Sequence, residues 1–484
     1  MTTAPNRPPA WVADAIFYQI FPDRFMRSGT TEQPPDLEPW NVPATVHGYK
    51  GGDLQGIVDR LDWLTDLGVN ALYLNPIFQS ASNHRYHTHD YFQVDPLLGG
   101  NAAFERLLKA CRDRGMKMVL DGVFNHASRG FFQFNDILES GEHSPWRDWF
   151  TIHSFPVEAY DGGQPPNYDA WWGLPALPKF NTNNPEVREF LMRVGEHWIS
   201  RGIDGWRLDV PLEIQTEGFW EEFRSRIRAQ NPDAYIVAEI WDDAADWISR
   251  GDRFDGAMNY LLAGAVVSFA GVQKIDWRLA DALDYNVRDI DAAGYAAAIE
   301  HILDLYPEFA TNANLNLLGS HDTARLRSIL GRDPDAVILA MLMVMTFPGA
   351  PCVYYGDEIG LLGGHDPANR AGFPWSRPAT WNRDILASVQ SLISVRRREP
   401  ALRHGSYTTL HAPTGGLLHV FERAYEGRRL VVAANVATAP AQAEFAVEAS
   451  DAVSLIWGDG AAEIDGGEMV LTVPERAGAI WSLG

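Results

Sequence analysis

Arg207 and Asp209 lie two residues apart in the segment GWRLDV, where apolar and aromatic side chains surround one cation and one carboxylate. In a buried strand, residues two apart project from the same face, so this spacing places the two side chains next to each other. A neighbouring cation favours the ionised form of a carboxylate. A fixed, ionised Asp can act as a nucleophile, although the same pair could also be a structural ion pair at a strand end.

Polar residues follow three other apolar segments in a similar way. The segment DGVFNH carries a carboxylate, an amide and an imidazole. VAEIW carries a carboxylate before an indole, and LLGSHD ends in an imidazole and a carboxylate. If these segments are parallel strands of one sheet, their carboxyl ends bring these side chains together. The residues are Asp121, Asn125, His126, Glu239, Trp241, His321 and Asp322.

Such a set of side chains suits the cleavage of a glycosidic bond. Repulsion among neighbouring carboxylates raises the pKa of at least one of them. One ionised carboxylate paired with one protonated acid is the machinery of glycoside hydrolysis. A single strand-end carboxylate can also cap the next helix, so only the combination favours a catalytic site. The histidines His126 and His321 are not spaced as zinc ligands, and we expect no catalytic metal.

Eight short apolar segments alternate with helical patterns and must position these residues. This alternation predicts an α/β fold, a (β/α)8 TIM barrel, whose chemistry lies at the carboxyl ends of its strands. The alternative is a doubly wound open sheet, but no glycine-rich phosphate loop follows the first strand. The predicted strands are 15–20, 71–74, 116–122, 205–210, 234–240, 256–260, 314–319 and 351–355, and the predicted helices include 54–67, 102–114, 185–201, 218–230 and 336–345.

Two further parts interrupt or follow this alternation. Residues 127–180 form too long a connection for a simple loop, and we predict a small subdomain inserted after the third strand. From residue 405 to 484, short alternating runs separated by turn signals predict a C-terminal all-β sandwich. The catalytic barrel is therefore predicted to comprise residues 1–126 and 181–404.

The composition of the chain limits the classes of binding partner and the cellular compartment that we expect. The chain has 484 residues and a net charge of −23, which argues against nucleic acid or an anionic membrane as a partner. The two cysteines, Cys111 and Cys352, are too few for a disulfide framework and fit a reducing compartment. No signal peptide and no apolar run of about 18 residues is recognisable, so we expect a cytoplasmic protein.

The four strand-end motifs, taken in order, resemble the signature regions of the α-amylase superfamily, glycoside hydrolase family 13. The resemblance runs from the first predicted strand to the C-terminal module. It implies Asp209 as the nucleophile, Glu239 as the general acid and base, and Asp322 as the transition-state stabiliser. It further implies that the sugar at the cleaved bond is bound by Arg207, His126 and His321.

Three more segments resemble the branch of neopullulanases, cyclomaltodextrinases and maltogenic amylases. They are LPKFN at 177–181, SNHRY at 82–86 and the run GGHDPANRAGFPW. The branch implies that Tyr86 stacks on the sugar before the cleaved bond, and that Asp366 and Arg370 bind donor-side hydroxyls. Glu213 matches an acceptor-side glutamate, and Trp241 matches an aromatic residue beside the acid and base.

Several positions depart from this branch. It usually carries an extra N-terminal β domain that forms dimers, so we expect a monomer or a homodimer formed through another surface. Its calcium loop corresponds here to 26–31, which lacks the oxygen ligands that calcium needs, leaving only Asp53 and Asn125 as donors. We therefore expect no cofactor. Near the sugar-binding positions, the residues that differ from the usual ones are His87, Leu212 and Asp242.

The resemblance implies a retaining hydrolase of short or cyclic maltooligosaccharides, which cleaves α-1,4 bonds, with α-1,6 bonds as a second target, and releases maltose. The altered positions favour a small ring such as cyclic maltosyl-maltose. The alternatives are a transglycosylase or an α-glucosidase, and a non-catalytic carbohydrate-binding homologue. Retaining chemistry requires the carboxyls of Asp209 and Glu239 about 5–5.5 Å apart. Trp171 and Trp172 could be sugar platforms, but we expect them in the core of the inserted subdomain.

Overall fold

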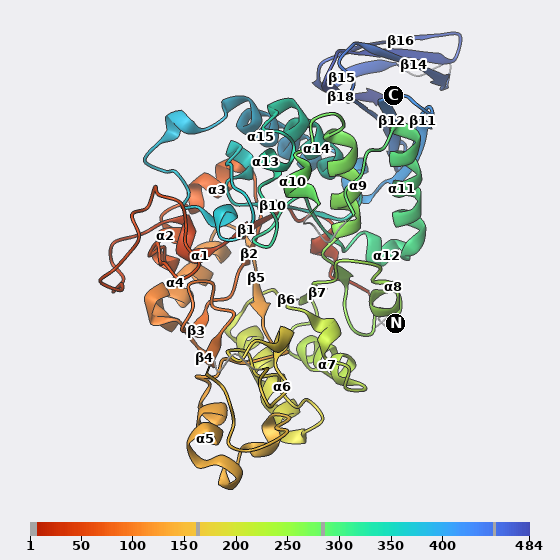
Figure 1. Ribbon diagram of the computed structural model, residues 1–484. Helices are drawn as coiled ribbons and strands as arrows, with labels where there is room; N and C mark the ends of the chain where they lie inside the picture. The colour runs from red at the N-terminus through yellow and green to blue at the C-terminus, as the bar shows by residue number, and fades with distance from the viewer. Residues whose placement is uncertain (1–6, 161–164, 282–285, 449–451) are drawn as a thin grey trace.

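An eight-stranded parallel barrel forms the centre of the computed structural model, which describes residues 7–160, 165–281, 286–448 and 452–484 (Figure 1). Neighbouring strands follow the order β8-β7-β6-β5-β2-β1-β10-β9. Every residue of seven of these strands is buried, and only the first residue of β5 is partly exposed. The strands are β1 (Phe17–Ile20), β2 (Ala71–Leu74), β5 (Lys117–Gly122), β6 (Gly205–Leu208), β7 (Tyr235–Ala238), β8 (Gly256–Ala257), β9 (Leu315–Leu317) and β10 (Ala350–Tyr354).

Met258 and Asn259 join the two outer strands of this sheet. Met258 forms a parallel bridge with Leu315 and donates its N–H to the Ala238 carbonyl at 2.8 Å. The Asn259 N–H donates to the Leu315 carbonyl at 2.9 Å. These contacts nearly close the sheet into a barrel, so the (β/α)8 prediction is confirmed and the open-sheet alternative is wrong.

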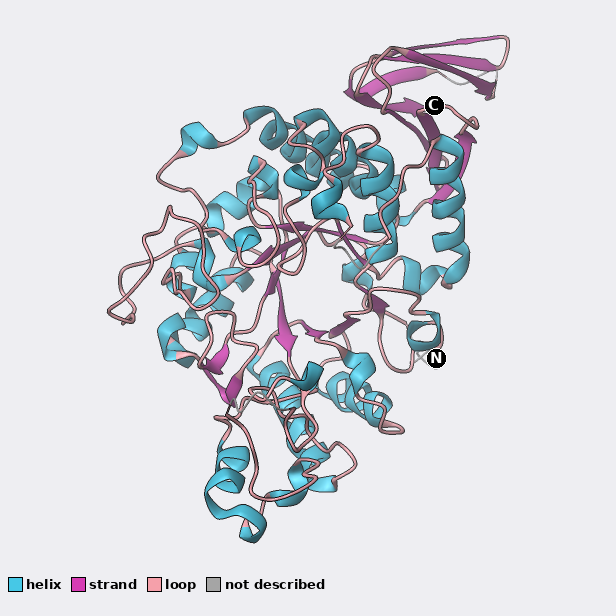
Figure 2. Ribbon diagram, viewed as in Figure 1, coloured by secondary structure: helices cyan, strands magenta, loops and turns pink. Residues whose placement is uncertain are grey.

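Helices surround the barrel (Figure 2). The predicted helix 185–201 is α6, which begins with the Asn184 cap and Pro185 and ends at Gly202 with φ of 101°. The predicted helix 54–67 is wrong as one element, because Arg60 has non-helical ψ and divides it into two. The helices are α1 (Pro22–Phe25), α2 (Leu54–Val58), α3 (Leu61–Leu67), α4 (Gly100–Arg112), α5 (Phe132–Ser140), α6 (Pro185–Arg201), α7 (Phe219–Gln230), α8 (Ala245–Ile248), α9 (Tyr260–Ala270), α10 (Trp277–Ala280), α11 (Ala292–Leu305), α12 (Glu308–Thr311), α13 (Leu326–Ile329), α14 (Pro334–Thr346), α15 (Arg383–Arg398) and α16 (Pro400–His404).

The segment between β5 and α6 folds as a unit that extends away from the barrel (Figure 1). Antiparallel bridges tie its ends together, including His126 with Lys179 and Ala170 with Pro178. Its core is aromatic and packs on Phe190 of α6. The aromatic residues of that core include Phe131, Phe134, Trp149, Phe150, Tyr168 and Phe180.

A C-terminal β module has two antiparallel sheets, with strand orders β11-β12-β13-β18-β15 and β14-β17-β16. Alternate residues of β13 pack into two different hydrophobic cores. Val431 and Ala433 face the second sheet, whereas Val432 packs with the barrel and its helices. The predicted all-β module is confirmed. The strands are β11 (Ser406–His411), β12 (Leu418–Tyr425), β13 (Arg428–Asn435), β14 (Ala441–Ala446), β15 (Val453–Gly458), β16 (Ala461–Asp465), β17 (Glu468–Val473) and β18 (Ala477–Leu483).

Two further sequence predictions concern the whole chain. Within the residues that the structure describes, none of the helices has the length and apolarity needed to cross a membrane. Cys111 and Cys352 are free and buried.

Candidate active site

Arg207, in β6, is the centre of a charged cluster at the carboxyl end of the barrel. Its Nη1 lies 2.8 Å from Asp121 Oδ1 on β5 and 2.9 Å from Asp209 Oδ1, just after β6. Its Nη2 lies 2.8 Å from Glu239 Oε1, just after β7. The guanidinium is fully buried. One cation therefore holds three carboxylates from neighbouring strands, as the predicted convergence of strand ends requires.

The protonation of this cluster is set by burial as well as by charge. Burial raises the pKa of Asp209 well above its ordinary value, the charge of Glu239 adds to that rise, and Arg207 opposes it. Burial likewise raises the pKa of Asp121. Arg207 therefore favours the ionised form of Asp209, as the sequence predicted, and it acts against the desolvation and the charge of Glu239.

Glu239 is positioned by contacts from both sides. Its Oε2 accepts the N–H of Val210 at 3.0 Å, and its Oε1 accepts the indole N–H of Trp241 at 3.2 Å. Val210 has φ of 35°, a left-handed conformation that is strained for a β-branched residue. The backbone directly after Asp209 is thus held in an unusual conformation that directs its N–H to the second carboxylate. Trp241 also stacks on Tyr260, with ring centroids 3.8 Å apart.

Tyr86 lies in the loop between β3 (Phe78–Ser80) and β4 (Thr88–Val94) and contacts His321. Their ring planes are 1° apart, and the hydroxyl lies 2.5 Å from His321 Nε2. The same hydroxyl donates to Asp121 Oδ2 at 2.8 Å. Because burial lowers the pKa of His321 well below its ordinary value, the imidazole is neutral at neutral pH.

Gln19 in β1 fixes the orientation of His321. Its amide Nε2 lies 3.0 Å from His321 Nδ1, so Nδ1 accepts and the ring proton sits on Nε2. Nε2 then donates toward the Tyr86 hydroxyl and toward Asp322 Oδ2, which is 3.2 Å away. Sequence reasoning missed Gln19, whose only sequence signal is that it is a polar residue inside a predicted buried strand. Asp121 was among the strand-end residues expected to come together, but it was given no role in the site.

Asp322 and Arg370 form the outer part of the same cluster. Arg370 Nη2 lies 3.4 Å from Asp322 Oδ1, and its Nη1 lies 3.0 Å from Asp366 Oδ1. Desolvation within the cluster and the charge of Glu239 raise the pKa of Asp322 to about 7, although 31% of its side chain is exposed, while Arg370 lowers it. Arg370 therefore connects Asp366, the other predicted donor-side residue, to Asp322, the candidate transition-state stabiliser.

His126 and Glu213 lie on the side of the inserted segment. His126 is buried, and burial lowers its pKa to about 3, so this imidazole is also neutral. Within the part of the chain that the structure describes, Glu213 makes no hydrogen bond or ion pair with the carboxylates of the cluster. It pairs with Lys179, whose Nζ lies 2.7 Å from Glu213 Oε2. The pair connects the inserted segment to the loop after β6.

A family model for the alpha amylase catalytic domain matches residues 19–404. The chain belongs to the α-amylase family. A cyclomaltodextrinase from a Bacillus species is 43% identical over 409 residues, covering 84% of this chain and 70% of that protein. The structure of a debranching enzyme from Nostoc punctiforme has a TM-score of 0.90 and 49% identity, covering 98% of this chain and 99% of that chain. Cyclic α-maltosyl-(1→6)-maltose hydrolase from Arthrobacter globiformis has a TM-score of 0.86 and 35% identity, covering 98% and 100%.

In this α-amylase family member, the residues that correspond to the calcium loop of the branch do not form a calcium site. Both carboxylate oxygens of Asp53 already accept protein hydrogen bonds, from Gly56 N at 2.7 Å and from Ser28 Oγ at 2.8 Å. Asn125 turns its amide toward His126. Among the described residues, no group of three histidine, cysteine or acidic side chains could hold a metal ion.

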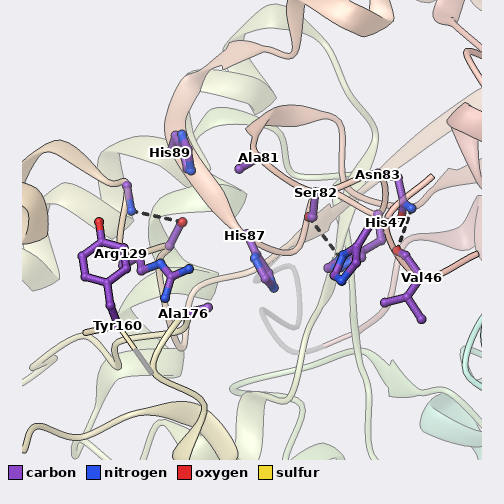
Figure 3. Close-up of a pocket in the computed structure, with 13 residues that line it drawn as sticks. Val46, His47, Ala81, Ser82, Asn83, His87, His89, Arg129, Tyr160 and Ala176 are labelled. Carbon is purple, nitrogen blue, oxygen red and sulfur yellow. Dashed lines mark hydrogen bonds between the residues drawn. The ribbon is translucent and has the colours of Figure 1, made fainter. Parts of the chain in front are cut away.

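A histidine-lined pocket of about 500 Å³ adjoins Tyr86 in this α-amylase fold. The ring of His84, in its wall, lies 5.7 Å from the Tyr86 ring. Figure 3 shows His87 between Arg129 and Tyr160 on one side and His47 on the other. Burial lowers the pKa of His87 to about 4 and that of His84 well below its ordinary value. Neutral imidazoles both donate and accept hydrogen bonds, which suits sugar hydroxyls.

Proposed function

We propose that this protein is a retaining glycoside hydrolase of short or cyclic maltooligosaccharides. The observation that carries the proposal is the single guanidinium of Arg207 in contact with both Asp209 and Glu239. It supports an arrangement in which a nucleophile and a proton donor act on one glycosidic bond. Asp322, linked to the same cluster through His321, is proposed to face the positive charge that develops on the sugar.

In the first step, the Asp209 carboxylate attacks the anomeric carbon while Glu239 protonates the leaving oxygen. The carbon–oxygen bond to the leaving sugar breaks, and a covalent glycosyl-enzyme forms. Arg207 favours the ionised form of Asp209, and the Val210 N–H fixes the Glu239 carboxyl. Asp322 stabilises the oxocarbenium-like transition state as an anion.

In the second step, Glu239 takes a proton from water, and the resulting nucleophile releases the sugar from Asp209 with retained configuration. The carboxyl separation of about 5–5.5 Å that this chemistry requires stays a prediction. The neutral imidazoles of His126 and His321 and the ring of Tyr86 are proposed to bind the sugar at the cleaved bond. Asp366 and Arg370 are proposed to bind the neighbouring donor-side unit.

The proposed substrates follow from the relatives and from the pocket beside Tyr86. The relatives are named as enzymes of cyclomaltodextrins, of branched chains and of a cyclic maltosyl-maltose ring. The wall of this pocket of about 500 Å³ includes the neutral imidazoles of His84 and His87, which can bind sugar hydroxyls, beside Arg129 and small apolar side chains. We propose cleavage of α-1,4 bonds, with α-1,6 bonds as secondary targets.

The proposed partners and cellular location of the protein follow from its net charge and from its two cysteines. A net charge of −23 disfavours nucleic acid and membrane partners. The two buried free thiols fit a reducing compartment, so we propose a cytoplasmic location. No cofactor enters the proposed mechanism, and the protein is proposed to be a monomer or a homodimer.

A transglycosylase is the second candidate, because Glu213 faces the acceptor side in the branch that the sequence resembles. Its pairing with Lys179 would orient a sugar hydroxyl in place of water. If so, Glu213→Gln lowers the ratio of transfer to hydrolysis products while total turnover stays within about threefold. A product ratio that does not change would favour the simple hydrolase.

The deciding experiment is a substrate panel read by chromatography of the products, with Asp209→Asn as the inactive control. The panel comprises α-, β- and γ-cyclodextrin, pullulan, soluble starch, maltotriose and a cyclic maltosyl-maltose tetrasaccharide. Faster opening of a ring than of starch supports the proposal and identifies the ring. Faster cleavage of starch or maltotriose contradicts it and favours an amylase or α-glucosidase. If the wild type equals Asp209→Asn on every substrate, the protein is a non-catalytic homologue.

A further inference from the structure

Three aromatic rings form a continuous stack at the edge of the candidate active site. The His126 ring lies 5.3 Å from that of Trp171, with planes 22° apart. The Trp171 ring lies 4.3 Å from that of Trp172, with planes 11° apart. The inner end of the stack is buried beside the barrel, whereas 79% of Trp172 is exposed. The expectation that Trp172 belongs to the subdomain core is therefore wrong.

The folded chain gains little from placing a tryptophan at position 172. The residue has φ of 51°, in the left-handed region that favours glycine or asparagine. Most of its large apolar ring stays exposed to water in the folded protein, so hydrophobic burial does not explain why a tryptophan stands at this position. A strained and exposed aromatic residue at a candidate site indicates a binding role rather than a packing role.

Trp171 supplies an independent observation. Its indole Nε1 is buried from solvent, yet it has no hydrogen-bond partner among the described residues. A buried N–H without an acceptor is unfavourable, and an acceptor on a bound molecule would satisfy it. A sugar hydroxyl beside the stack is such an acceptor.

The position of the stack relates it to the bond that is cut. His126 forms a bridge with Lys179, and Lys179 pairs with Glu213 across the loop after β6. The stack thus begins at a residue proposed to contact the sugar at the cleaved bond and leads outward along the inserted segment. A sugar on Trp172 would be a different unit of the same chain.

We propose that Trp172 is an aromatic platform for a glucosyl unit outside the cleavage position, and that the Trp171 N–H donates to a hydroxyl of the bound chain. The apolar face of a pyranose ring suits a flat exposed indole. This inference rests on the proposed function, because it assigns a longer substrate chain to the same site. Stacking of this kind is expected to change affinity by about 3- to 10-fold.

The test uses Trp172→Gly and Trp172→Phe, each combined with Asp209→Asn so that bound sugar is not cleaved. Calorimetric titration with maltohexaose and with maltotriose gives the affinities. We expect Trp172→Gly to weaken maltohexaose binding about 3- to 10-fold and maltotriose binding less than twofold, with Trp172→Phe recovering most of the loss. The melting temperature should not fall, because glycine relieves the left-handed strain.

The matched control is Glu426→Gly. Glu426 is also exposed and has φ of 47°, but it lies in the turn between β12 and β13, in the C-terminal module. This variant changes the backbone in the same way without removing an aromatic ring, and it should leave both affinities unchanged.

Two results would overturn the proposal. One is unchanged maltohexaose affinity in Trp172→Gly. The other is an equal loss for both sugars together with a lower melting temperature, which would indicate a structural role for Trp172. Failure of the proposed function gives a different result, because neither sugar would then bind the Asp209→Asn protein that retains both tryptophans.

Discussion

The Nη2 atom of Arg207 lies 2.8 Å from Oε1 of Glu239, although the two residues belong to successive segments of the barrel separated by helix α7. The same guanidinium reaches Asp209 through Nη1. Arg207 therefore sets the relative positions of the proposed nucleophile and the proposed acid. A planar group with several fixed donors can do this, whereas a single ammonium cannot.

The first prediction follows from that geometry. Arg207→Lys keeps the positive charge but cannot contact all three carboxylates at once, so kcat/KM should fall by about 100-fold or more. Steady-state kinetics on the best substrate of the panel measures the loss. Arg226→Lys is the control, since Arg226 forms ion pairs on the partly exposed face of α7 and its replacement should change activity less than twofold. Equal activities of the two variants would contradict this role of Arg207.

The second prediction concerns the pH dependence of activity. The pKa of Asp322 is raised to about 7, and the residue is proposed to act as an anion. The value of kcat/KM should therefore decline as the pH falls below about 7. Because the charge of Arg370 lowers this pKa, Arg370→Gln should move the decline to higher pH. The exposed arginine control, Arg377→Gln, should leave the profile in place. A decline at the same pH in all three proteins would refute the assignment.

The third prediction concerns stability, through a buried acid that the proposed mechanism does not use. Burial raises the pKa of Glu358 to about 7, and Glu358 accepts hydrogen bonds from Tyr18 at 2.8 Å and Gly356 N at 2.7 Å. Between its ordinary value and about pH 7, the folded protein holds a proton that the unfolded chain has released. Stability is therefore lost as the pH rises through this range.

Glu358→Gln should remove that loss while keeping both hydrogen bonds, because the Tyr18 hydroxyl can accept from the amide. At pH 8 the variant should be more stable than the wild type by up to about 3 kcal/mol, and the difference should vanish near pH 4. Urea denaturation at the two pH values measures it. The exposed control, Glu105→Gln, should stay within about 0.5 kcal/mol at both. A difference independent of pH would argue against a titration effect.

The fourth prediction concerns calcium. Since Asp53 uses its carboxylate to cap α2 and to bind Ser28, removing divalent ions should change neither activity nor melting temperature. Dialysis against a chelator, followed by both measurements, provides the test. A melting temperature that falls and is restored by calcium alone would reveal a site that these residues do not form.

The sequence alone determined most of the residues that meet at the barrel mouth, although it did not indicate Gln19. Strand and helix patterns are local, so the apolar segments ending in Arg207, Glu239 and His321 could be assigned without knowing their neighbours. The caps of α6 are local as well, which is why its bounds match the prediction. Because the carboxyl ends of parallel strands share one edge, these assignments also predicted that the side chains converge.

Only the tertiary structure decided how those side chains divide their interactions. The sharing of Arg207 by three carboxylates depends on distances between different strands, and so do the burial and the charge of Glu239 that raise the pKa of Asp209. Closure of the barrel by Met258 and Leu315 depends on the accumulated twist of the whole sheet. The exposure of Trp172 depends on how the inserted segment folds back on His126. Contacts between distant segments leave no periodic signal in a single sequence, so they become visible only once the chain is folded.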